Sequence, residues 1–350
     1  MEEIKKYGSI AAFLLLGGIS CWATEHSVEL LLQSINIPVW FIWGITIAFF
    51  IVASIGTKMI MESLDHDNYL EHRRRKFWIG VTLVVIFWLI YSLPTNTHTF
   101  FYSHSIANVA KEDLKTTAGY LRQISEREVV DPGYNDFVSR ANERFNELNN
   151  ELHGYGRTGQ IGNSVGVMEE VNKVNNVFRE EGVDIALSYD SSSRNANDVF
   201  QSYQDQFNNA LNVVKDTKYK VPEIEAEKAS ELLAQIEVDE SDINKMSQKG
   251  KTDDKLINNV STDLLSGYTI IKDNKRFVKF ANDIDAKKFT SENLETRTKR
   301  MLSVTDVFAD FVCGKYPMSF IWYVLLSILI DVAAFLFFDY AFKQQSNLNQ

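Results

Sequence analysis

Four long apolar runs constrain the fold of this chain more than any other feature of its sequence. Three lie near the N-terminus, at residues 10–23, 39–56 and 77–93, and the fourth lies at residues 318–338. A helix needs about 20 predominantly apolar residues to cross the hydrocarbon core of a bilayer. The last three runs reach about that length, and Val28 with the leucines that follow it extends the first. We therefore expect four transmembrane helices, at about residues 8–32, 38–57, 77–94 and 317–342.

The distribution of basic residues predicts which way these helices cross the membrane. The loop at residues 58–76 is basic, whereas the loop at residues 25–38 contains no Lys or Arg. The residues that determine this topology are Arg73, Arg74, Arg75 and Lys76. Short basic loops stay in the cytoplasm. We therefore expect a multi-pass protein of the plasma (inner) membrane, with both termini and the tail at residues 343–350 in the cytoplasm and residues 98–316 in the periplasm or outside the cell.

The first apolar run admits a second interpretation. Lys5 and Lys6 followed by a short apolar stretch are also typical of a cleaved signal peptide, and "GGISC" resembles a lipoprotein cleavage site at Cys21. Gly18 stands three residues before that cysteine, where a bulky aliphatic residue is usual. This favours a retained first span. The later topology is the same under both interpretations, because the second span enters from outside in either case.

The segment between the third and fourth spans is polar and has helical periodicity. Its apolar residues recur every three or four positions, as on one face of an amphipathic helix. Three such stripes run from Tyr134 to Leu152, from Val167 to Phe178 and from Val199 to Val214. Residues 239–255 contain few apolar residues and are expected to be mobile.

These patterns together predict the fold class and the domains. Helices with one apolar face must bury it against each other. We therefore predict an all-α membrane protein with four transmembrane helices and an elongated extracytoplasmic helical bundle inserted between spans three and four. The expected domains are residues 1–97 with three spans, residues 98–316 as the extracytoplasmic part, and residues 317–342 as the fourth span.

The stretch "HGYGRTGQIGN" at residues 153–163 has the letters of a dinucleotide-binding turn, Gly154-x-Gly156-x-x-Gly159. Such a turn needs a strand before it, a helix after it and an acidic residue about 20 positions further on. Here an amphipathic helix precedes the glycines, and Gly154 stands where a helix C-cap glycine belongs. We interpret the stretch as a helix–loop–helix connection. A second hypothesis is that Tyr155 and Arg157 on this loop contact a protein partner.

The sequence offers no set of residues for catalysis, a metal or a cofactor. Residues 98–316 hold 28 Lys and Arg against 36 Asp and Glu. Nucleic-acid binding normally begins with a basic patch, so we expect no nucleic-acid partner. No local nucleophile–histidine–acid signature is present, and we expect no enzyme activity. The histidines are interpreted as membrane-boundary residues (His98 and His104) or as part of a solvated loop (His66 and His72) rather than as metal ligands.

The two cysteines have no motif around them. By the expected topology, Cys21 and Cys313 both fall near the outer face of the membrane, so a disulfide between them is geometrically conceivable. Helix packing decides whether they meet. We expect two buried thiols instead.

Asp331 is the most informative single residue, because it lies about two-thirds of the way through the fourth span. A carboxylate at that depth costs several kcal/mol unless it is protonated, paired or wetted. We expect it to face other helices, with a hydroxyl such as that of Thr82 or a tyrosine within reach. It is either an ion or proton site or a polar lock between helices or subunits, and the second is favoured. At the cytoplasmic ends of two spans, Lys58 and Asp339 are predicted to form an interfacial pair.

The layout has a short outer loop, a basic inner loop and a large outer loop between spans three and four. It resembles that of animal tetraspanins in topology alone. Tetraspanins also carry a Cys-Cys-Gly motif and paired cysteines in the large loop, whereas this loop contains only Cys313. The chain also resembles an uncharacterised bacterial family of four-span membrane proteins with a long helical loop between spans three and four. The glycine-rich break "GYGRTGQIG" and the polar Asp331 carry that resemblance. It covers most of the chain and implies no activity and no site.

We therefore expect an integral membrane protein that presents a helical extracytoplasmic domain for protein–protein interaction. It would serve as a scaffold, a sensor or an accessory subunit of an envelope complex, without catalysis and without a cofactor. The expected partners are the lipid bilayer and an unidentified protein or further copies of the chain. The alternative is an oligomeric channel or ion-conducting subunit with Asp331 in or near the pore.

Overall fold

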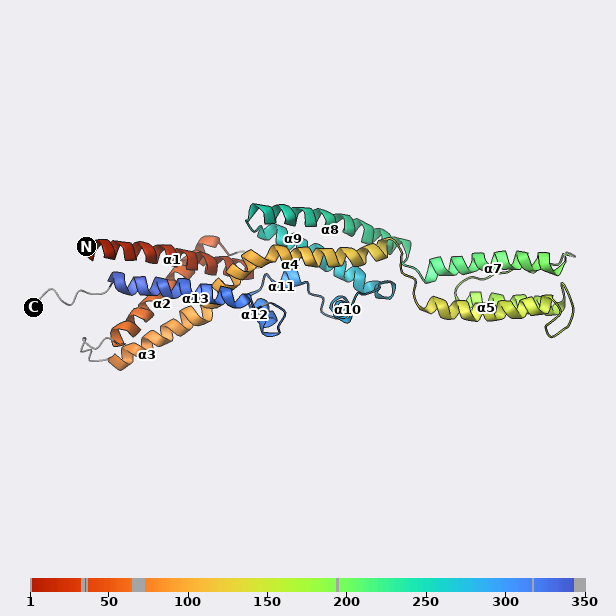
Figure 1. Cartoon of the computed structure of the whole chain (residues 1–350), viewed down its shortest axis with the longest axis horizontal. Helices are drawn as coiled ribbons and strands as arrows, with labels where there is room; N and C mark the ends of the chain where they lie inside the picture. The colour runs from red at the N-terminus through yellow and green to blue at the C-terminus, as the bar shows by residue number, and fades with distance from the viewer. Residues whose placement is uncertain are drawn as a thin grey trace, which may run out of the picture. The chain divides into compact units, whose positions relative to one another are not determined.

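The computed structural model describes residues 2–32, 35, 37–64, 73–192, 195–316 and 318–342, and these residues are almost entirely helical (Figure 1). Helices account for 80% of the structure, and the described residues contain no strand. The chain divides into two compact units. The first comprises Met1–Asp113, Ser241–Ser261 and Glu295–Gln350, and the second comprises Leu114–Glu240 and Thr262–Leu294. The prediction of an all-α protein is confirmed.

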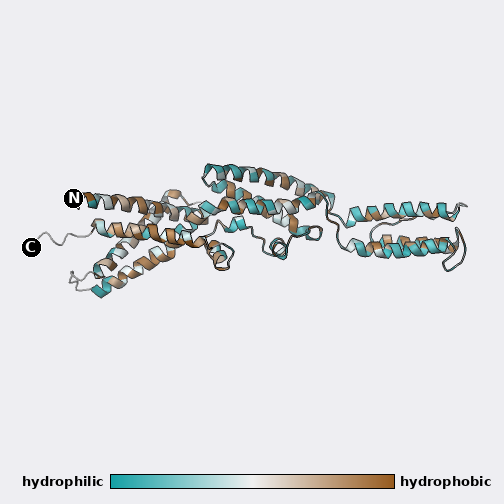
Figure 2. Cartoon of the chain, in the orientation of Figure 1, coloured by the Kyte–Doolittle hydropathy of each residue, from teal (hydrophilic) through white to brown (hydrophobic). Residues whose placement is uncertain are grey.

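The first unit holds the helices that are able to cross a membrane. Its elements are α1 (Glu2–Leu32), α2 (Val39–Leu64), α3 (Arg73–Val84), η1 (Val85–Ser92), the first part of α4 (Leu93–Ser125), the end of α8 (Glu223–Lys249), the start of α9 (Asp254–Asp273), α11 (Arg297–Arg300), α12 (Val304–Val312) and α13 (Phe320–Phe342). Four helices are long and apolar enough to span a bilayer, at Ile4–Leu32, Val39–Leu64, Arg73–Ser125 and Phe320–Phe342. In Figure 2 brown, the colour of hydrophobic residues, predominates along α13, whereas the later part of the third candidate span, in α4, is largely teal. The prediction of four candidate membrane helices is confirmed.

The third candidate span is one continuous helix of 53 residues, built from α3, η1 and α4. Its middle part, η1, is a π-helix, in which each backbone N–H bonds to the carbonyl five residues earlier. The last such bond runs from the N–H of Leu93 to the carbonyl of Trp88. Polar residues therefore follow the apolar run without any break in the helix.

Small residues allow the membrane helices to approach each other closely. A Cβ atom on Gly80 of α3 would lie 2.6 Å from the carbonyl oxygen of Gly56 on α2, so neither position has room for a side chain. Glycine contacts of this kind are common where membrane helices pack backbone to backbone. Elsewhere, α1 packs against both α2 and α13. The apolar core of that contact consists of Cys21, Phe50, Ala53, Ala334 and Phe335.

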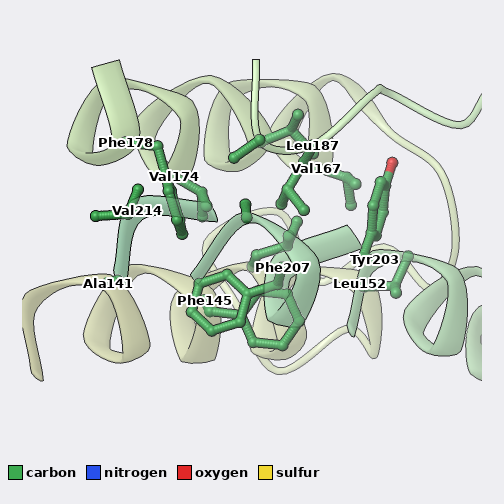
Figure 3. Packing of buried hydrophobic residues seen from close by; sticks show 14 of the residues in the cluster. Ala141, Phe145, Leu152, Val167, Val174, Phe178, Leu187, Tyr203, Phe207 and Val214 are labelled. Carbon is green, nitrogen blue, oxygen red and sulfur yellow. The ribbon is translucent and has the colours of Figure 1, made fainter. Parts of the chain in front are cut away.

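The second unit contains a three-helix bundle formed by α5 (Gly133–Leu152), α6 (Val165–Glu180) and α7 (Ala196–Lys218). The three apolar stripes of the sequence meet in its core (Figure 3). At the centre, the rings of Phe145 and Phe207 stack with their centroids 4.3 Å apart. The amphipathic pattern of the sequence thus predicts that α5, α6 and α7 are helical and which face of each helix is buried.

The remaining helices are α8 (Glu223–Lys249), α9 (Asp254–Asp273), the 3-10 turn η2 (Lys275–Phe277) and α10 (Asp283–Thr290). The expectation that residues 239–255 are mobile is wrong for most of that stretch, because α8 continues to Lys249. Ile243 and Met246 are buried and provide the apolar contacts that the sparse pattern concealed.

Candidate functional site

A cluster of buried polar side chains lies among the membrane helices of the first unit. We call it the membrane polar cluster. It consists of Ser20 and Thr24 from α1, Ser92 from η1, Thr95 and Asn96 from α4, and Asp331 from α13. Each of these residues is buried. Groups of this kind are expensive inside a bilayer unless they bond to each other, so their positions are linked.

Asp331 is fully buried and accepts hydrogen bonds from three successive turns of the third candidate span. The indole Nε1 of Trp88 lies 2.9 Å from Oδ2, and the Oγ of Ser92 lies 3.4 Å from it. The side-chain amide of Asn96 lies 3.3 Å from Oδ1 and 3.2 Å from Oδ2. The expectation that Asp331 faces other helices is therefore confirmed. The prediction that the Thr82 hydroxyl bonds to Asp331 is wrong, because this hydroxyl donates to the carbonyl of Trp78 in its own helix.

Asn96 connects Asp331 to α1. Its amide nitrogen donates to the Oγ of Ser20 at 2.8 Å, and its amide oxygen accepts a hydrogen bond of 2.7 Å from Thr24. Thr95 donates to Thr24 in turn, at 3.2 Å. The sequence interpretation missed this cluster. The signal was present, since Ser20, Thr24 and Ser27 recur at helical spacing across the end of one apolar run, and Ser92, Asn96 and Thr99 recur in the same way across the end of another.

A second group of buried polar residues continues along the same helices. The hydroxyl of Ser27 lies 2.8 Å from Nδ1 of His98 and 2.7 Å from the hydroxyl of Thr99. Nε2 of His98 lies 3.0 Å from the carbonyl oxygen of Met301. The ring of His98 is fully buried and bonded on both nitrogens, so it does not present an amphipathic side chain to the membrane surface. Its position at the membrane boundary stays a prediction. His104 is exposed, as a boundary residue should be.

The described residues contain no group of three or more His, Cys, Asp or Glu side chains able to hold a metal ion. His66 and His72 lie outside the described residues. The space beside the membrane polar cluster is also small. A cavity of about 10 Å³ is lined by Ser20, Thr24 and Ser92 together with residues of α2 and η1. That volume accommodates about one water molecule, so the side chains fill this layer of the structure.

Lys58 lies at the end of α2 beside the end of α13. Its Nζ donates to the main-chain carbonyl of Phe342 at 2.5 Å and lies 3.8 Å from Glu62. This places Lys58 beside the helix that carries Asp339, three residues before Phe342. The pairing of Lys58 with Asp339 itself stays a prediction.

The glycine-rich loop, residues 153–164, joins α5 to α6 in the second unit and surrounds the carboxylate of Glu151. The backbone N–H of Thr158 donates to Glu151 at 3.1 Å. A Cβ atom on Gly156 would lie 2.1 Å from Oε2, and one on Gly166 would lie 2.1 Å from Oε1. Gly156 and Gly166, the second of which lies in α6, are therefore required by close approach to a carboxylate of the chain itself. Gly154, Gly159 and Gly162 instead adopt a positive φ. The expected helix–loop–helix connection is confirmed.

Glu151 is stabilised in its charged form by this loop. Hydrogen bonds from the side chain and the backbone of Thr158, together with the nearby charge of Arg157, hold the pKa of Glu151 below its ordinary value. The backbone of the loop is also tied to α5, since Tyr155 N–H donates to Asn150 and Gly162 N–H donates to Leu152. The loop thus has one defined conformation built around a buried anion.

Exposed apolar side chains lie on this loop and at the start of α6, beside exposed polar residues such as Arg157 and Gln160. Tyr155 is 85% exposed, Ile161 is 78% exposed and Val165 is 69% exposed. Ile161 lies next to Tyr155, because its side chain covers Gly154. Arg157 pairs with Glu169 of α6. Of the two predicted contact residues, Tyr155 therefore has a freely accessible side chain, and Arg157 is held by an ion pair.

Both cysteines are free thiols, and their burial differs. Cys21 is buried in the contact between membrane helices, whereas Cys313 is exposed just after α12. The expectation of two buried thiols is therefore wrong for Cys313. The turn that ends α12 leaves this side chain on the surface.

Comparison with known proteins adds no relative. No protein-family model matches the chain, and no curated protein and no solved structure matches it. Its function is therefore inferred from its own geometry.

Proposed function

We propose that this protein is an integral membrane protein that binds a partner protein through its helical extracytoplasmic domain. It would act as a scaffold, a sensor or an accessory subunit of an envelope complex. The observation that carries the proposal is the exposure of three apolar side chains, those of Tyr155 and Ile161 on the glycine-rich loop and that of Val165 at the start of α6. Exposed apolar side chains grouped in one place mark interaction sites on soluble domains.

The construction of the loop supports this role. A loop that is already ordered loses little conformational entropy when it binds. Here the carboxylate of Glu151 and the backbone bonds to α5 hold the loop in place. Tyrosine is enriched at the energetically important positions of protein interfaces, because it combines apolar area with a polar end. Tyr155 would be the central contact residue.

The proposed location outside the cytoplasm rests on the charge of the loops between the spans. Arg73, Arg74, Arg75 and Lys76 begin α3, and basic residues of this kind stay on the cytoplasmic side. A helix that crosses the bilayer from that end places α4 and the segment after it on the opposite side. The glycine-rich loop would then meet partners in the periplasm or outside the cell.

A pull-down from the native host tests the proposal. Full-length tagged protein would be purified in mild detergent, and co-purifying proteins identified by mass spectrometry. A Tyr155→Ser/Ile161→Ser double variant should lose a stoichiometric partner that the wild type retains. Ile284→Ser is the matched control, since Ile284 is equally exposed, at 78%, on α10. If the double variant retains every partner of the wild type, the loop is not the binding surface.

A second candidate function is an oligomeric channel or ion-conducting subunit, and the burial of Asp331 favours it. Intramembrane carboxylates often mark ion or proton pathways. This function predicts a homo-oligomer of several copies by light scattering and a conductance that Asp331→Asn abolishes without changing assembly. The narrow cavity beside the membrane polar cluster means that a pore would have to form between copies. An unchanged current in Asp331→Asn would exclude the channel role of this residue.

A further inference from the structure

The exposed side of α3 changes from basic to apolar along its length. A hollow of about 710 Å³ lies against this side. Arg73, Arg74 and Arg75 line its basic end, and Trp78, Ile79 and Leu83 line its apolar part. All the residues that line it belong to α3, so the hollow is an open groove along one helix rather than an enclosed pocket. An open groove of this kind suits a lipid that lies along the helix with its other side in the bilayer.

The dimensions of α3 match one leaflet of a bilayer. A helix rises about 1.5 Å per residue, so the distance from Arg74 to Leu83 is about 14 Å. Half of the hydrocarbon core of a bilayer is about 15 Å thick. Trp78 stands between the basic and the apolar parts and is 58% exposed, and tryptophan is enriched at the boundary between membrane and water. The arginines would thus lie at the level of the headgroups.

The charges at this site are only partly neutralised by the protein. Nε of Arg73 donates to the carbonyl of Ser63 on α2, and Nζ of Lys76 lies 3.9 Å from Glu62. Within the described part of the chain, the exposed guanidinium groups of Arg74 and Arg75 have no carboxylate at ion-pair distance. Guanidinium groups bind phosphate through paired hydrogen bonds. Two such groups beside the exposed apolar side chains of α3 could bind the phosphate of a lipid while those side chains contact its acyl chains.

We propose that α3 binds one phospholipid with an anionic headgroup. Its phosphate lies on Arg74 and Arg75, and an acyl chain lies along Trp78, Ile79 and Leu83. A free phosphate ion would use only the arginines and would leave these apolar side chains uncovered. The site is independent of the glycine-rich loop, so the proposed partner binding and the lipid binding stand or fall separately.

Native mass spectrometry of the full-length protein in detergent tests this site. Phosphatidylglycerol and phosphatidylcholine of identical chain length would be titrated in turn. We expect phosphatidylglycerol to bind more tightly. An Arg74→Gln/Arg75→Gln double variant should lose about 30-fold in affinity for it, since each basic residue near a membrane contributes about fivefold. The variant should fold normally, because both side chains are exposed.

A Lys5→Gln/Lys6→Gln double variant is the matched control, because it removes two exposed positive charges from α1. It should bind phosphatidylglycerol as the wild type does. Trp78→Ala should weaken binding of both lipids, since it removes apolar contact and no charge. Equal binding of the two lipids by the wild type, or an equal loss in both double variants, would overturn the proposal. Displacement of the lipid by millimolar inorganic phosphate would also overturn it and identify a site for free phosphate.

Discussion

The side-chain amide of Asn96 lies within hydrogen-bond distance of both carboxylate oxygens of Asp331, although 235 residues separate them. The same amide donates to Ser20, so one side chain links α1, α4 and α13. Lipid tails are as apolar as leucine, so burial of apolar surface does little to choose which helix faces meet in a bilayer. Polar contacts of this kind make that choice.

Replacing Asp331 with leucine should lower the thermal stability of the purified protein. The change leaves the indole N–H of Trp88 and the amide of Asn96 without their acceptor. The expected loss is about 1–3 kcal/mol, visible as a lower unfolding midpoint in detergent. Thr82→Val is the control, because the Thr82 hydroxyl bonds only within its own helix. Equal midpoints for the two variants would mean that the cluster does not hold the helices together.

Gly80→Ala should separate α2 from α3. Its new methyl group would lie 2.6 Å from the carbonyl oxygen of Gly56 and 3.1 Å from the backbone nitrogen of Ile60. Overpacking of this kind costs about 1–3 kcal/mol. Gly44→Ala, also in a membrane helix, meets no atom within 4 Å and should leave the unfolding midpoint unchanged. The prediction fails if both alanine variants melt together with the wild type.

Gly166→Ala should disrupt the glycine-rich loop. The added methyl group would lie 2.1 Å from Oε1 of Glu151 and 2.7 Å from Cγ2 of Thr158, so the carboxylate must move. We expect a loss of about 1–3 kcal/mol and faster proteolysis of the loop. Gly119→Ala, in an open position on α4, should be neutral or stabilising, because alanine favours helix more than glycine does. A proteolysis pattern identical to that of Gly119→Ala would contradict the role of Glu151.

Lowering the pH should reduce the stability of the glycine-rich loop, because it protonates Glu151. Because its folded pKa lies below the ordinary value of 4.5, its contribution to stability is present above about pH 4.5 and is lost as the pH falls through the folded pKa. Glu151→Gln should lose this part of the pH dependence and be less stable at neutral pH, by about 1.5–3 kcal/mol. Unfolding midpoints between pH 3 and pH 7 measure both effects, with the pH range set by this linkage. Parallel midpoint curves for the two proteins would contradict the prediction.

Asp310 should contribute to acid sensitivity in the same direction. Burial by itself raises the pKa of Asp310, but hydrogen bonds from Arg300 and Lys315 outweigh burial and leave the pKa below its ordinary value. The acid sensitivity that remains in Glu151→Gln should therefore decrease further when Asp310→Asn is added. An additive change would show that the two sites act separately.

Cys313 offers a direct test of topology. It is exposed, while Cys21 is buried, so a membrane-impermeant maleimide added to intact cells should label Cys313 alone if residues 98–316 lie outside the cytoplasm. Cys313→Ser should abolish the labelling. Labelling that appears only after the cells are permeabilised would reverse the proposed orientation.

The sequence predicts the helices of this chain better than it predicts their contacts. The apolar runs and the stripe from Tyr134 to Leu152 are enough to predict which residues are buried, because the spacing of apolar residues can be read within a single helix. The partner of Asp331 could not be derived in the same way. It depends on which faces of α1, η1 and α13 meet, and Thr82 and Asn96 are both plausible until that is known. The actual partners are Trp88, Ser92 and Asn96, which follow one another every four residues along the third candidate span.

For the glycine-rich loop, the sequence excluded a wrong function but did not explain why the glycines are needed. Its letters matched a dinucleotide turn, and the preceding helix was enough to set that interpretation aside. The reason for the glycines could not be inferred, because Glu151 reads as one more charged residue at the end of an amphipathic helix. Only the folded loop brings Gly156 and Gly166 against its two oxygens.

The π-helix η1 has a consequence for how this protein can change in evolution. A π-turn holds one residue more than an α-turn, which rotates everything after it by about 100° about the helix axis. In a uniform α-helix with the same number of residues, Asn96 would point about 100° away from its present direction. Deleting one residue from Val85–Ser92 would remove the extra residue of the π-turn, so the segment could become an ordinary α-helix while Asn96 still faced Asp331. The π-turn therefore lets this helix carry one extra residue without losing the contact between Asn96 and Asp331.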